Sequence, residues 1–485
     1  MELGPETRHT IVRPTDYQKD GLKIIESHKG RVLVCDEMGL GKTLLALFYL
    51  QRHPEIRPAL VLCPAGLKRN WRREAERFAF KTVICEGMSP CFSPSDLRSV
   101  DLAIMNYDII APGADGPGWY ETAWYTRFKM LICDECEHLK KLTAKRTRYA
   151  VPLSRPIPHI LMMSGTPMTD KPSDLFPIVN MLWPSYFDSD FTFFQHFCEA
   201  HQERGQWVFK GGRNLDQLHR LLKSKGMVRR TKRQVLPDLP AKIRKVISVE
   251  INNREEYDFA ERDLVGWLAT WDRVRAEKAA YALRMTRFGY LLRLAAKGKM
   301  PAVCRWIDDF LIKNQKLMVF AYHKDIISSL MERYESKYKA VVIDGSKTAR
   351  QRDDNEQKFK KDPACRLLIG QNKSCGRGLN FENIPSLTVE LSWDPAQHNQ
   401  LEARNHRMTT KVPVTNHYIL AKDTVEEKLC RILQRKQQYL DEVLDGVERT
   451  PDSLTIYDEL QAAMTGTPVT SFLKKVVTLF KGGKK

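Results

Sequence analysis

The nine residues 35–43, CDEMGLGKT, decide the reading of this chain. They end like a phosphate-binding loop, but Asp36 stands where the pattern G-x-x-x-x-G-K-[ST] has its first glycine. The apolar run RVLVC precedes them, and KTLLALFYLQ, which has the character of a helix, follows. In such a strand–turn–helix context, backbone N–H groups cradle phosphates, the lysine reaches the outer phosphates and the threonine hydroxyl binds Mg²⁺. The stretch predicts a nucleotide site, with a purely structural turn as the alternative; its candidate binding residues are Gly39, Leu40, Gly41, Lys42 and Thr43.

Short apolar runs recur along the chain and are separated by amphipathic stretches. The first half has RVLVCDE, PALVLCP, DLAIMNY, KMLICDE and HILMMSG; the second half has KLMVFAY, KAVVIDG, RLLIGQ, LTVELSW and HYILAK. Continuous β-rich runs that alternate with helices indicate parallel strands buried on both faces. The two sets predict two α/β domains with a helix-rich segment between them.

A change of composition over 226–245, GMVRRTKRQVLPDLPAKIRK, predicts the domain boundary, since charge, prolines and a loss of periodicity coincide there. We expect a first lobe over 1–235, a connecting segment with a helical insertion over 236–315, and a second lobe over 316–450. A C-terminal helix and a basic tail, SFLKKVVTLFKGGKK, are expected over 451–485.

An acidic pair follows one of the predicted strands of the first half. The run FKMLIC ends in Asp134 and Glu135, and polar residues at the carboxyl ends of parallel strands collect at one edge of the sheet. Asp134 is therefore a candidate Mg²⁺ ligand, together with Thr43, and Glu135 a candidate base that orients or deprotonates the attacking water. Two acids in a solvated loop are the alternative.

A second candidate set lies in SWDPAQHNQLEARNHR. Asp394 suits a helix N-cap and Pro395 the first helical position. In the helix that should follow, Gln400, Arg404 and Arg407 are spaced i, i+4 and i+7, on one face. Two arginines on one face can stabilise charge on a transferred phosphoryl group; a solvated basic helix is the alternative.

The bulk composition predicts a soluble protein with a polyanionic partner. The chain has 485 residues, a formal net charge of +19, 42% hydrophobic and 28% charged residues. The chain contains no run of about eighteen apolar residues, so no membrane span is predicted. The start MELGPETRHT does not have the pattern of a secretion signal. The cysteines, scattered singly through apolar segments, predict reduced buried thiols, and the pair Cys133 and Cys136 lacks the second ligand pair of a zinc site.

The ordered motifs resemble those of superfamily-two helicases and, within them, of Swi/Snf-type DNA translocases. In that family the phosphate loop takes the form DEMGLGKT, the acidic motif resembles DECEHLKK, and the coupling motif resembles LMMSGTPMTDKPSDLF. MVRRTKRQVLPDLPAK is similar to the brace between the two lobes, and DYQKDGL to the segment that reads adenine through a glutamine. The likeness spans about residues 12–430. It implies two RecA-like parallel-sheet lobes with a helical insertion, and ATP and Mg²⁺ as cofactors.

The resemblance also assigns residues to roles. It implies Gln18 at the adenine; Lys42, Asp134, Glu135, Gln400, Arg404 and Arg407 in ATP hydrolysis; Ser164, Gly165, Thr166, Gly376 and Gly378 in coupling ATP to DNA; and Lys68, Arg69, Asn70, Trp71, Lys373 and Ser374 as DNA contacts. The chain departs from the family pattern at Glu137, where His or Gln is usual, and at Thr409 and Thr410, where Gly-Gln is usual.

The predicted function is an ATP-dependent translocase on double-stranded or branched DNA, in which two lobes close on ATP and part on hydrolysis. DNA contacts should be mainly to phosphates. The alternatives are a strand-separating DNA or RNA helicase and an ATPase-inactive nucleic-acid-binding scaffold. Compact motors of this kind look like those of bacteria and their viruses, related to the annealing-helicase branch, so we expect a cytoplasmic location, or a nuclear one in a eukaryote; no membrane role is expected.

Overall fold

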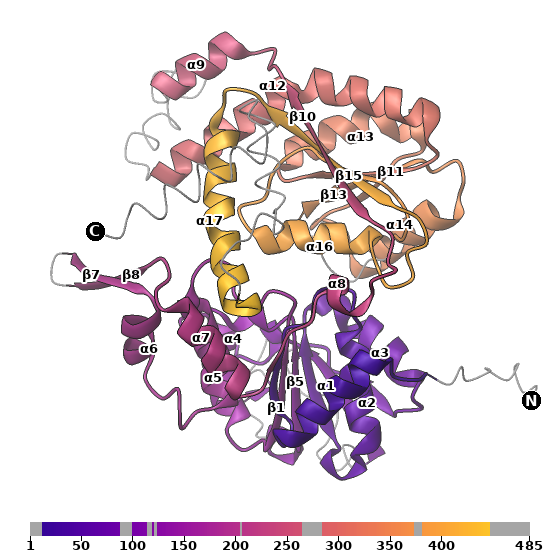
Figure 1. The fold of residues 1–485 in the computed structure, drawn as a ribbon. Helices are drawn as coiled ribbons and strands as arrows, with labels where there is room; N and C mark the ends of the chain where they lie inside the picture. Colours follow the sequence, from indigo (N-terminus) through magenta and orange to yellow (C-terminus); the bar gives the residue numbers. More distant parts are fainter. Residues whose placement is uncertain are drawn as a thin grey trace, which may run out of the picture. The chain divides into compact units, whose positions relative to one another are not determined.

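The computed structural model describes residues 12–87, 99–113, 119–120, 124–203, 206–263, 284–372 and 381–446. The chain divides into two compact units (Figure 1). The first unit holds the chain as far as Pro237 together with the later stretch Tyr439–Glu448, and the second begins at Asp238 and includes everything as far as Gln438. Each unit is described by itself.

The first unit is built on a parallel sheet, which in the described part of the chain has seven strands in the order β3-β4-β2-β5-β6-β1-β9. Its strands are β1 (Arg31–Val34), β2 (Ala59–Cys63), β3 (Thr82–Ile84), β4 (Leu102–Asn106), β5 (Met130–Asp134), β6 (His159–Met163) and β9 (Met227–Val228). The central strands are buried on both faces, as expected of a parallel sheet between two helical layers.

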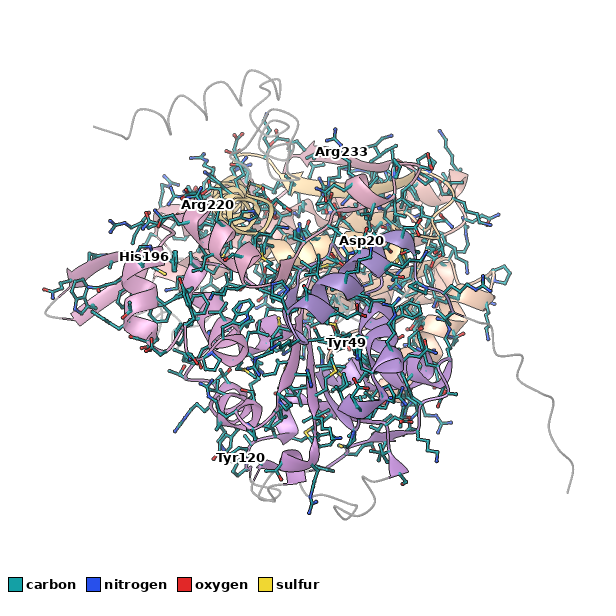
Figure 2. All side chains as sticks on the ribbon, turned by 60° about the horizontal axis from the view of Figure 1, so that its bottom comes forward. Asp20, Tyr49, Tyr120, His196, Arg220 and Arg233 are labelled. Atoms are coloured by element: carbon teal, nitrogen blue, oxygen red, sulfur yellow. The ribbon has the colours of Figure 1, made fainter. Side chains whose placement is uncertain are left out.

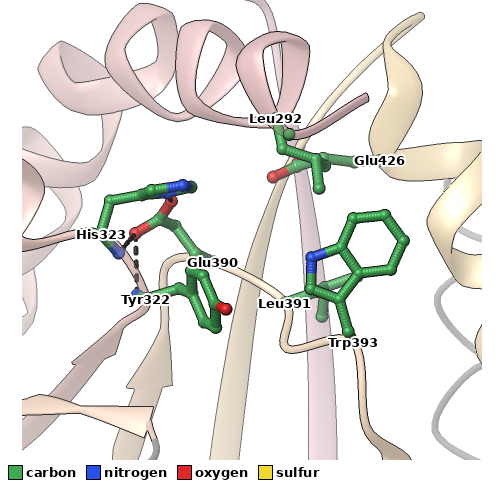
Figure 3. A pocket seen from close by; sticks show the side chains of 8 residues that line it. Leu292, Tyr322, His323, Glu390, Leu391, Trp393 and Glu426 are labelled. Atoms are coloured by element: carbon green, nitrogen blue, oxygen red, sulfur yellow. Dashed lines mark hydrogen bonds and ion pairs between the residues drawn. The ribbon is translucent and has the colours of Figure 1, made fainter. Parts of the chain in front are cut away.

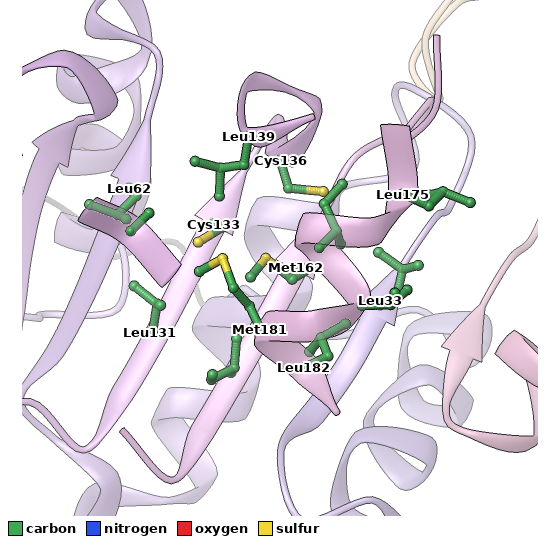
Figure 4. Close-up of a cluster of buried hydrophobic side chains, with 14 of the residues drawn as sticks. Leu33, Leu62, Leu131, Cys133, Cys136, Leu139, Met162, Leu175, Met181 and Leu182 are labelled. Atoms are coloured by element: carbon green, nitrogen blue, oxygen red, sulfur yellow. The ribbon is translucent and has the colours of Figure 1, made fainter. Parts of the chain in front are cut away.

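Alternate residues of these strands face two different helical layers. Val32 and Val34 pack with α1 (Asp16–Ser27), α2 (Lys42–Arg52) and α3 (Lys68–Glu76). Leu33 and Cys35 pack on the other face, with α4 (Lys145–Ser154), α5 (Phe176–Leu182) and α7 (Leu215–Ser224). Figure 4 shows part of this second cluster, where Met181 and Leu182 of α5 cover the strands.

The first helical layer separates buried from solvated side chains in the usual way. Tyr49 of α2 is buried, whereas Asp20 of α1 forms an exposed ion pair with Lys23 (Figure 2). On the opposite side of the unit, α6 (Asp190–Phe197) is followed by the antiparallel hairpin β7 (Glu199–Glu203) and β8 (Gln206–Lys210). Its ring pairs, such as Phe194 with Phe209 at 5.4 Å, join the hairpin to α6.

The second unit is built on another parallel sheet, with six strands in the described residues, in the order β10-β15-β14-β11-β13-β12. Its strands are β10 (Lys242–Val249), β11 (Leu317–Ala321), β12 (Val341–Ile343), β13 (Leu367–Gln371), β14 (Ser386–Thr388) and β15 (Val414–Ala421). Val319 packs with α12 (Arg284–Lys313) and α13 (Lys324–Tyr338), whereas Phe320 packs with α14 (Ala349–Lys361) and α16 (Pro395–Asn405).

Two further helices complete the described structure of the second unit. α9 (Arg254–Arg262) packs against α12, and α17 (Val425–Asp445) packs its first half into the same cluster through Leu429 and Leu433. The last residues of α17 belong to the first unit, where Leu440, Val443 and Leu444 join the core of the first sheet. The helix therefore takes part in both units.

The predicted fold class is confirmed, since each unit has a parallel sheet with helices packed on both faces. All ten apolar runs contribute strands, and among the described residues β3, β7, β8, β9 and β10 are additional. α9 and α12 lie in the segment expected to be helical, while 264–283 and the basic tail lie outside the described residues. Within the described ranges no helix combines the length and the apolar character that crossing a membrane requires.

Candidate functional site

The phosphate-loop sequence forms the turn between β1 and α2. Gly39 and Gly41 have φ values of 90° and 74°, left-handed conformations that glycine adopts at little cost. Gly41 is the N-cap of α2, so the helix begins at Lys42 with its first N–H groups unpaired by the helix. Lys42 Nζ donates to the backbone oxygen of Asp36 at 2.8 Å. The turn has the geometry that the sequence predicted for a phosphate cradle.

The aspartate in the place of the first glycine has a structural role. Asp36 is 1% exposed, and its two carboxylate oxygens accept bonds from Nε and Nη2 of Arg230, the former at 2.9 Å. Arg230 follows β9 and also donates to the backbone oxygen of Tyr17. A bidentate arginine–carboxylate pair fixes both position and orientation. This pair anchors the start of the phosphate loop to the segment after β9.

Further bonds hold the loop to its surroundings. Tyr17 donates its hydroxyl to the Leu40 oxygen at 3.1 Å, and Gln18 Nε2 lies 3.5 Å from the Gly41 oxygen. Gln18 is buried and completes the capping box of α1. It lies beside the phosphate loop, and its role as the adenine-reading residue stays a prediction.

The acidic pair lies at the end of β5, two strands from β1 in the sheet. Asp134 is buried, and its pKa is raised to about 6 by burial and by the neighbouring Glu135, while the Trp71 bond and the Lys42 charge act in the opposite direction. Its oxygen Oδ2 accepts a bond from Trp71 Nε1 at 2.9 Å.

Glu135 has an unusual backbone conformation and an unusual side-chain environment. Its backbone is left-handed, with φ 51° and ψ 54°, which is costly for a residue with a side chain. Its oxygen Oε2 is buried and has no hydrogen-bond partner among the described residues. Strain together with an unsatisfied buried carboxylate is typical of a functional site, and here it occurs at the candidate catalytic base.

Trp71 has a different place from the one the resemblance implied. Lys68, Arg69, Asn70 and Trp71 form the first turn of α3, but the Trp71 side chain is fully buried and supports Asp134. We therefore remove Trp71 from the candidate DNA contacts. Lys68 donates to the Cys85 backbone oxygen at 3.0 Å. Lys68, Arg69 and Asn70 remain predicted contacts.

The candidate coupling residues of the first unit follow β6, the strand between β5 and β1. Ser164 donates its hydroxyl to Glu137 Oε2 at 2.8 Å and accepts from Thr166 N at 3.0 Å. Glu137, which departs from the family pattern, thus links the acidic motif to the coupling motif. A Cβ on Gly165 would lie 2.6 Å from Met38 Cγ, so glycine lets this turn approach the phosphate loop.

In the second unit, the predicted start of α16 is confirmed: the Asp394 side chain accepts from Ala396 N and Pro395 is the first helical residue. The helix ends at Asn405, however, and Arg407 lies beyond it. Its N–H donates to Thr410 Oγ1 at 2.7 Å. The expectation that Gln400, Arg404 and Arg407 share one helical face is therefore wrong for Arg407, because the Thr410 hydroxyl holds its backbone in a turn.

Contacts of Glu402 and His406 hold α16 and the residue after it in the second unit. Glu402 is 2% exposed and accepts from Lys242 Nζ at 2.7 Å and from Arg244 Nε and Nη2 at 2.8 Å. These cations and their hydrogen bonds hold the pKa of Glu402 far below its usual range, against the effect of burial. His406 is buried and its Nε2 lies 2.8 Å from the Pro240 oxygen, so His406 has a packing role.

The remaining predicted residues, Lys373, Ser374, Gly376 and Gly378, lie outside the described residues. Their roles stay predictions.

The donor set of the first unit suits ATP with Mg²⁺. Among the residues that the structure describes, no cluster of three or more His, Cys, Asp or Glu side chains offers a full metal cage. Mg²⁺ in nucleotide sites is held by one or two protein oxygens and by substrate phosphates. Asp134 and the Thr43 hydroxyl offer those oxygens, and the buried Glu135 oxygen Oε2 has no hydrogen-bond partner among the described residues.

Reading the sequence alone missed the residues that support the site. Arg229 Nη1 donates to the Cys35 oxygen at 2.9 Å, and its Nε pairs with Asp445 at 2.8 Å. Lys140 donates to Thr169 Oγ1, which in turn donates to Asp174 at 3.0 Å. The signal for Arg229 and Arg230 was present in the basic run MVRRTKR, which was interpreted only as a connection between lobes.

The comparisons with known proteins place the chain in a family. Residues 17–294 match the SNF2-related domain and residues 298–409 the helicase conserved C-terminal domain. Because the first match covers more than half of the chain, the protein belongs to the family with the SNF2-related domain.

Particular relatives are longer. "DNA annealing helicase and endonuclease ZRANB3" of Mus musculus is 29% identical over 97% of this chain and 45% of its own length. "SWI/SNF-related matrix-associated actin-dependent regulator of chromatin subfamily A-like protein 1" of Xenopus tropicalis is 27% identical over 93% and 48%. The chain thus spans about half the length of these relatives. The solved "Sulfolobus solfataricus SWI2/SNF2 ATPase core in complex with dsDNA" is 19% identical over 95% of this chain and 98% of that one, with a TM-score of 0.41.

Proposed function

We propose that the protein is a DNA-dependent ATPase that moves along double-stranded DNA. The observation that carries this proposal is the meeting of three motifs at the carboxyl ends of the neighbouring strands β5, β6 and β1. There the phosphate loop, the acidic pair and the coupling turn are joined by the Glu137–Ser164 bond and by the close approach of Gly165 to Met38. Membership of the SNF2-related family supports the same conclusion.

The residues divide the chemistry among them. The N–H groups at the start of α2 and Lys42 bind the phosphates. Asp134 and Thr43 would hold the Mg²⁺, which would neutralise charge on the phosphates. Glu135 takes a proton from the attacking water. Gln400, Arg404 and Arg407 of the second unit keep their predicted role in stabilising charge on the transferred phosphoryl group.

The DNA substrate follows from charge and family. A net charge of +19 favours a polyanion, and contacts made by Lys68, Arg69, Asn70, Lys373 and Ser374 would go mainly to phosphates, independent of sequence. The name of one relative includes DNA annealing, so forks and other branched structures are the proposed substrates. The proposed location is wherever that DNA lies, the cytoplasm of a bacterial or virus-infected cell or a eukaryotic nucleus.

ATP hydrolysis with different nucleic acids tests the proposal. We would measure it with no nucleic acid, single-stranded DNA, duplex DNA, branched DNA and RNA, for the wild type and for Lys42→Ala. Stimulation by duplex or branched DNA, abolished by the substitution, is the expected result. Stimulation mainly by single strands or RNA would favour the strand-separating helicase. Salt-sensitive DNA binding without any hydrolysis would favour the inactive scaffold.

A further inference from the structure

A pocket of about 300 Å³ lies wholly within the second unit. It lies at the point of the sheet from which the connections between strands lead in opposite directions. From β11 the chain runs through α13 to β12 on one side, whereas from β14 it runs through α16 to β15 on the other. β11 and β14 are neighbours, so the segments that follow them diverge. Crevices at such points, outside the carboxyl ends of the strands, are where open α/β sheets bind ligands.

The walls of the pocket are aromatic and apolar. Tyr322 and His323 directly follow β11, and Leu391 and Trp393 follow β14. Figure 3 shows the Tyr322 and His323 rings on one side and the Trp393 indole on the other, with Leu292 of α12 above. Tyr322 is 38% exposed. Flat rings on two sides of a space of this size suit a flat ring system.

Two buried carboxylates, Glu390 and Glu426, are among the polar groups that line the pocket. Glu390, 4% exposed, accepts from the backbone N–H groups of Tyr322 and His323 at 2.8 and 2.9 Å, and its Oε1 lies 2.5 Å from His323 Nδ1. Glu426 is paired with the fully buried Lys299 at 2.6 Å. A carboxylate has about four lone-pair sites, so Glu390 retains the capacity to accept one further N–H.

Two cationic residues of α12 follow the lining residue Leu292 in the chain, Arg293 directly and Lys297 about one helical turn later, and they are called the rim below. Arg293 and Lys297 of α12 both approach Asp325, at 2.8 and 3.8 Å. One carboxylate thus serves two cations, and these side chains are partly exposed. The excess positive charge disfavours a basic peptide at the entrance and favours a ligand whose outer part is a phosphate.

We propose that this pocket takes an unpaired nucleobase with an exocyclic amine, stacked between Tyr322 and Trp393 and donating to Glu390, with its sugar-phosphate at the Arg293–Lys297 rim. Adenine, cytosine and guanine present such an amine. Thymine presents one N–H between two carbonyl oxygens, which a carboxylate repels. The inference rests on the proposed DNA substrate and adds to it a site for a base that is not paired, as at a branch point.

Gly289 allows the pocket to be filled without removing any of its contacts. This glycine of α12 lines the pocket, and a Cβ placed on it meets nothing within 4 Å. Gly289→Trp therefore places a ring in the space. The matched control is Ile312→Trp, which adds a ring to the same helix at a position that is 78% exposed. Thermal melting of both variants establishes that they are folded.

The experiment measures binding without ATP, by anisotropy of labelled eight-nucleotide strands of dA, dC or dT and of a duplex of about 20 base pairs. For the wild type and Ile312→Trp we expect dA and dC to bind about tenfold more tightly than dT. In folded Gly289→Trp this preference disappears, while duplex affinity changes less than about twofold. A 2-aminopurine at the branch point of a fork should be quenched by the wild type and by Ile312→Trp, and remain bright with Gly289→Trp.

Competition by dAMP identifies the source of the base. Failure of millimolar dAMP to displace the dA strand supports a base presented by DNA, and full displacement supports a base from a free nucleotide. The proposal is overturned if Gly289→Trp keeps the preference for dA and dC over dT. It is also overturned if the pocket binds a basic peptide in place of bases and Gly289→Trp abolishes that binding. Base binding that survives without any DNA-stimulated hydrolysis would instead contradict the proposed function alone, since these titrations need no ATP.

Discussion

At the scale of single residues, the pair Asp36–Arg230 explains why this phosphate loop does without its first glycine. The left-handed positions of the loop are Gly39 and Gly41, while position 36 supplies a charge. That charge is buried, and Arg230 satisfies it from 194 residues further along the chain. Removing one partner of a buried ion pair leaves the other uncompensated, which is more costly than the pair itself is stabilising.

We therefore expect Asp36→Gly, which restores the generic loop pattern, to impair the protein. Arg230→Met should lower the free energy of unfolding by about 3–5 kcal/mol, since Asp36 then stays buried and unpaired. In a separate cycle, the double variant Asp36→Asn with Arg230→Met should lose less than the sum of the losses in the single variants Asp36→Asn and Arg230→Met. Urea unfolding of the four proteins gives the coupling. Additive losses would show that the two side chains act independently.

The strained conformation of Glu135 leads to a second prediction. Glu135→Gly removes both the left-handed strain and a buried unpartnered oxygen, so it should stabilise the protein by about 1 kcal/mol while abolishing ATP hydrolysis. The control is Lys339→Gly, at an exposed residue with φ 48° that caps α13. It should give a smaller gain and leave hydrolysis unchanged. A destabilised Glu135→Gly protein would contradict this account; melting temperatures and hydrolysis rates provide the comparison.

The residues of the phosphate loop and the acidic pair were predictable because each motif is continuous in sequence and follows its own strand. Their supporting partners were not. Trp71 reaches Asp134 across 63 residues and Arg230 reaches Asp36 across 194. Such contacts depend on which strands become neighbours, which local patterns do not determine. Trp71 was assigned to DNA by the family resemblance alone, which does not tell that its indole is buried against Asp134.

At the scale of elements, strands were predictable where apolar runs are continuous and were missed where they are not. β10 has alternating partly buried and exposed residues at the edge of its sheet, and β9 has two residues. α16 shows the same limit at its end. Its N-terminus was readable from Asp394 and Pro395, but its C-terminus depends on the bond from Arg407 N to Thr410 Oγ1.

α16 also carries a group that should make the stability of the second unit depend on pH. His398 is fully buried and accepts from Ser392 N at 2.9 Å, and burial lowers its pKa to about 4. In the unfolded chain the histidine has its ordinary pKa of about 6.5, so it takes up the proton at a higher pH than in the folded protein. Stability is therefore complete above pH 6.5 and is lost as the pH falls toward 4, by up to about 3 kcal/mol.

His398→Gln should lack this part of the acid loss, whereas His196→Gln, at an exposed position of α6, should keep it. Urea unfolding at several pH values between 4 and 7.5 measures the difference. Parallel curves for the wild type and His398→Gln would mean that His398 does not titrate on unfolding.

At the scale of the whole molecule, α17 means that the two units are not two consecutive halves of the chain. Its residues Leu440, Val443 and Leu444 are buried in the first unit, and Asp445 pairs there with Arg229. The predicted domains are consecutive segments of the chain, so they do not include a C-terminal stretch that belongs to the first unit. Amphipathicity predicts that a helix is covered on one face but does not say by which domain.

Leu444→Ala should therefore destabilise the first unit, by about 2–5 kcal/mol as for other buried leucines. The matched control is Leu433→Ala. Leu433 lies earlier in the same helix and is buried in the second unit. Hydrogen exchange should rise in β1 and β9 for the first variant and in β15 and α12 for the second. The same pattern of exchange in both variants would contradict the division of α17 between the units.

The return of α17 also bears on how the protein is made. The ribosome completes residues as far as Pro237 and then synthesises the whole of Asp238–Gln438 before the last piece of the first core emerges. At about 5–20 residues per second this takes roughly 10–40 s. During that interval the nascent first unit exposes the apolar surface that Leu440, Val443 and Leu444 later cover, and it is open to chaperones. The unit whose translation begins first is therefore completed only after Asp238–Gln438 of the second unit have been made.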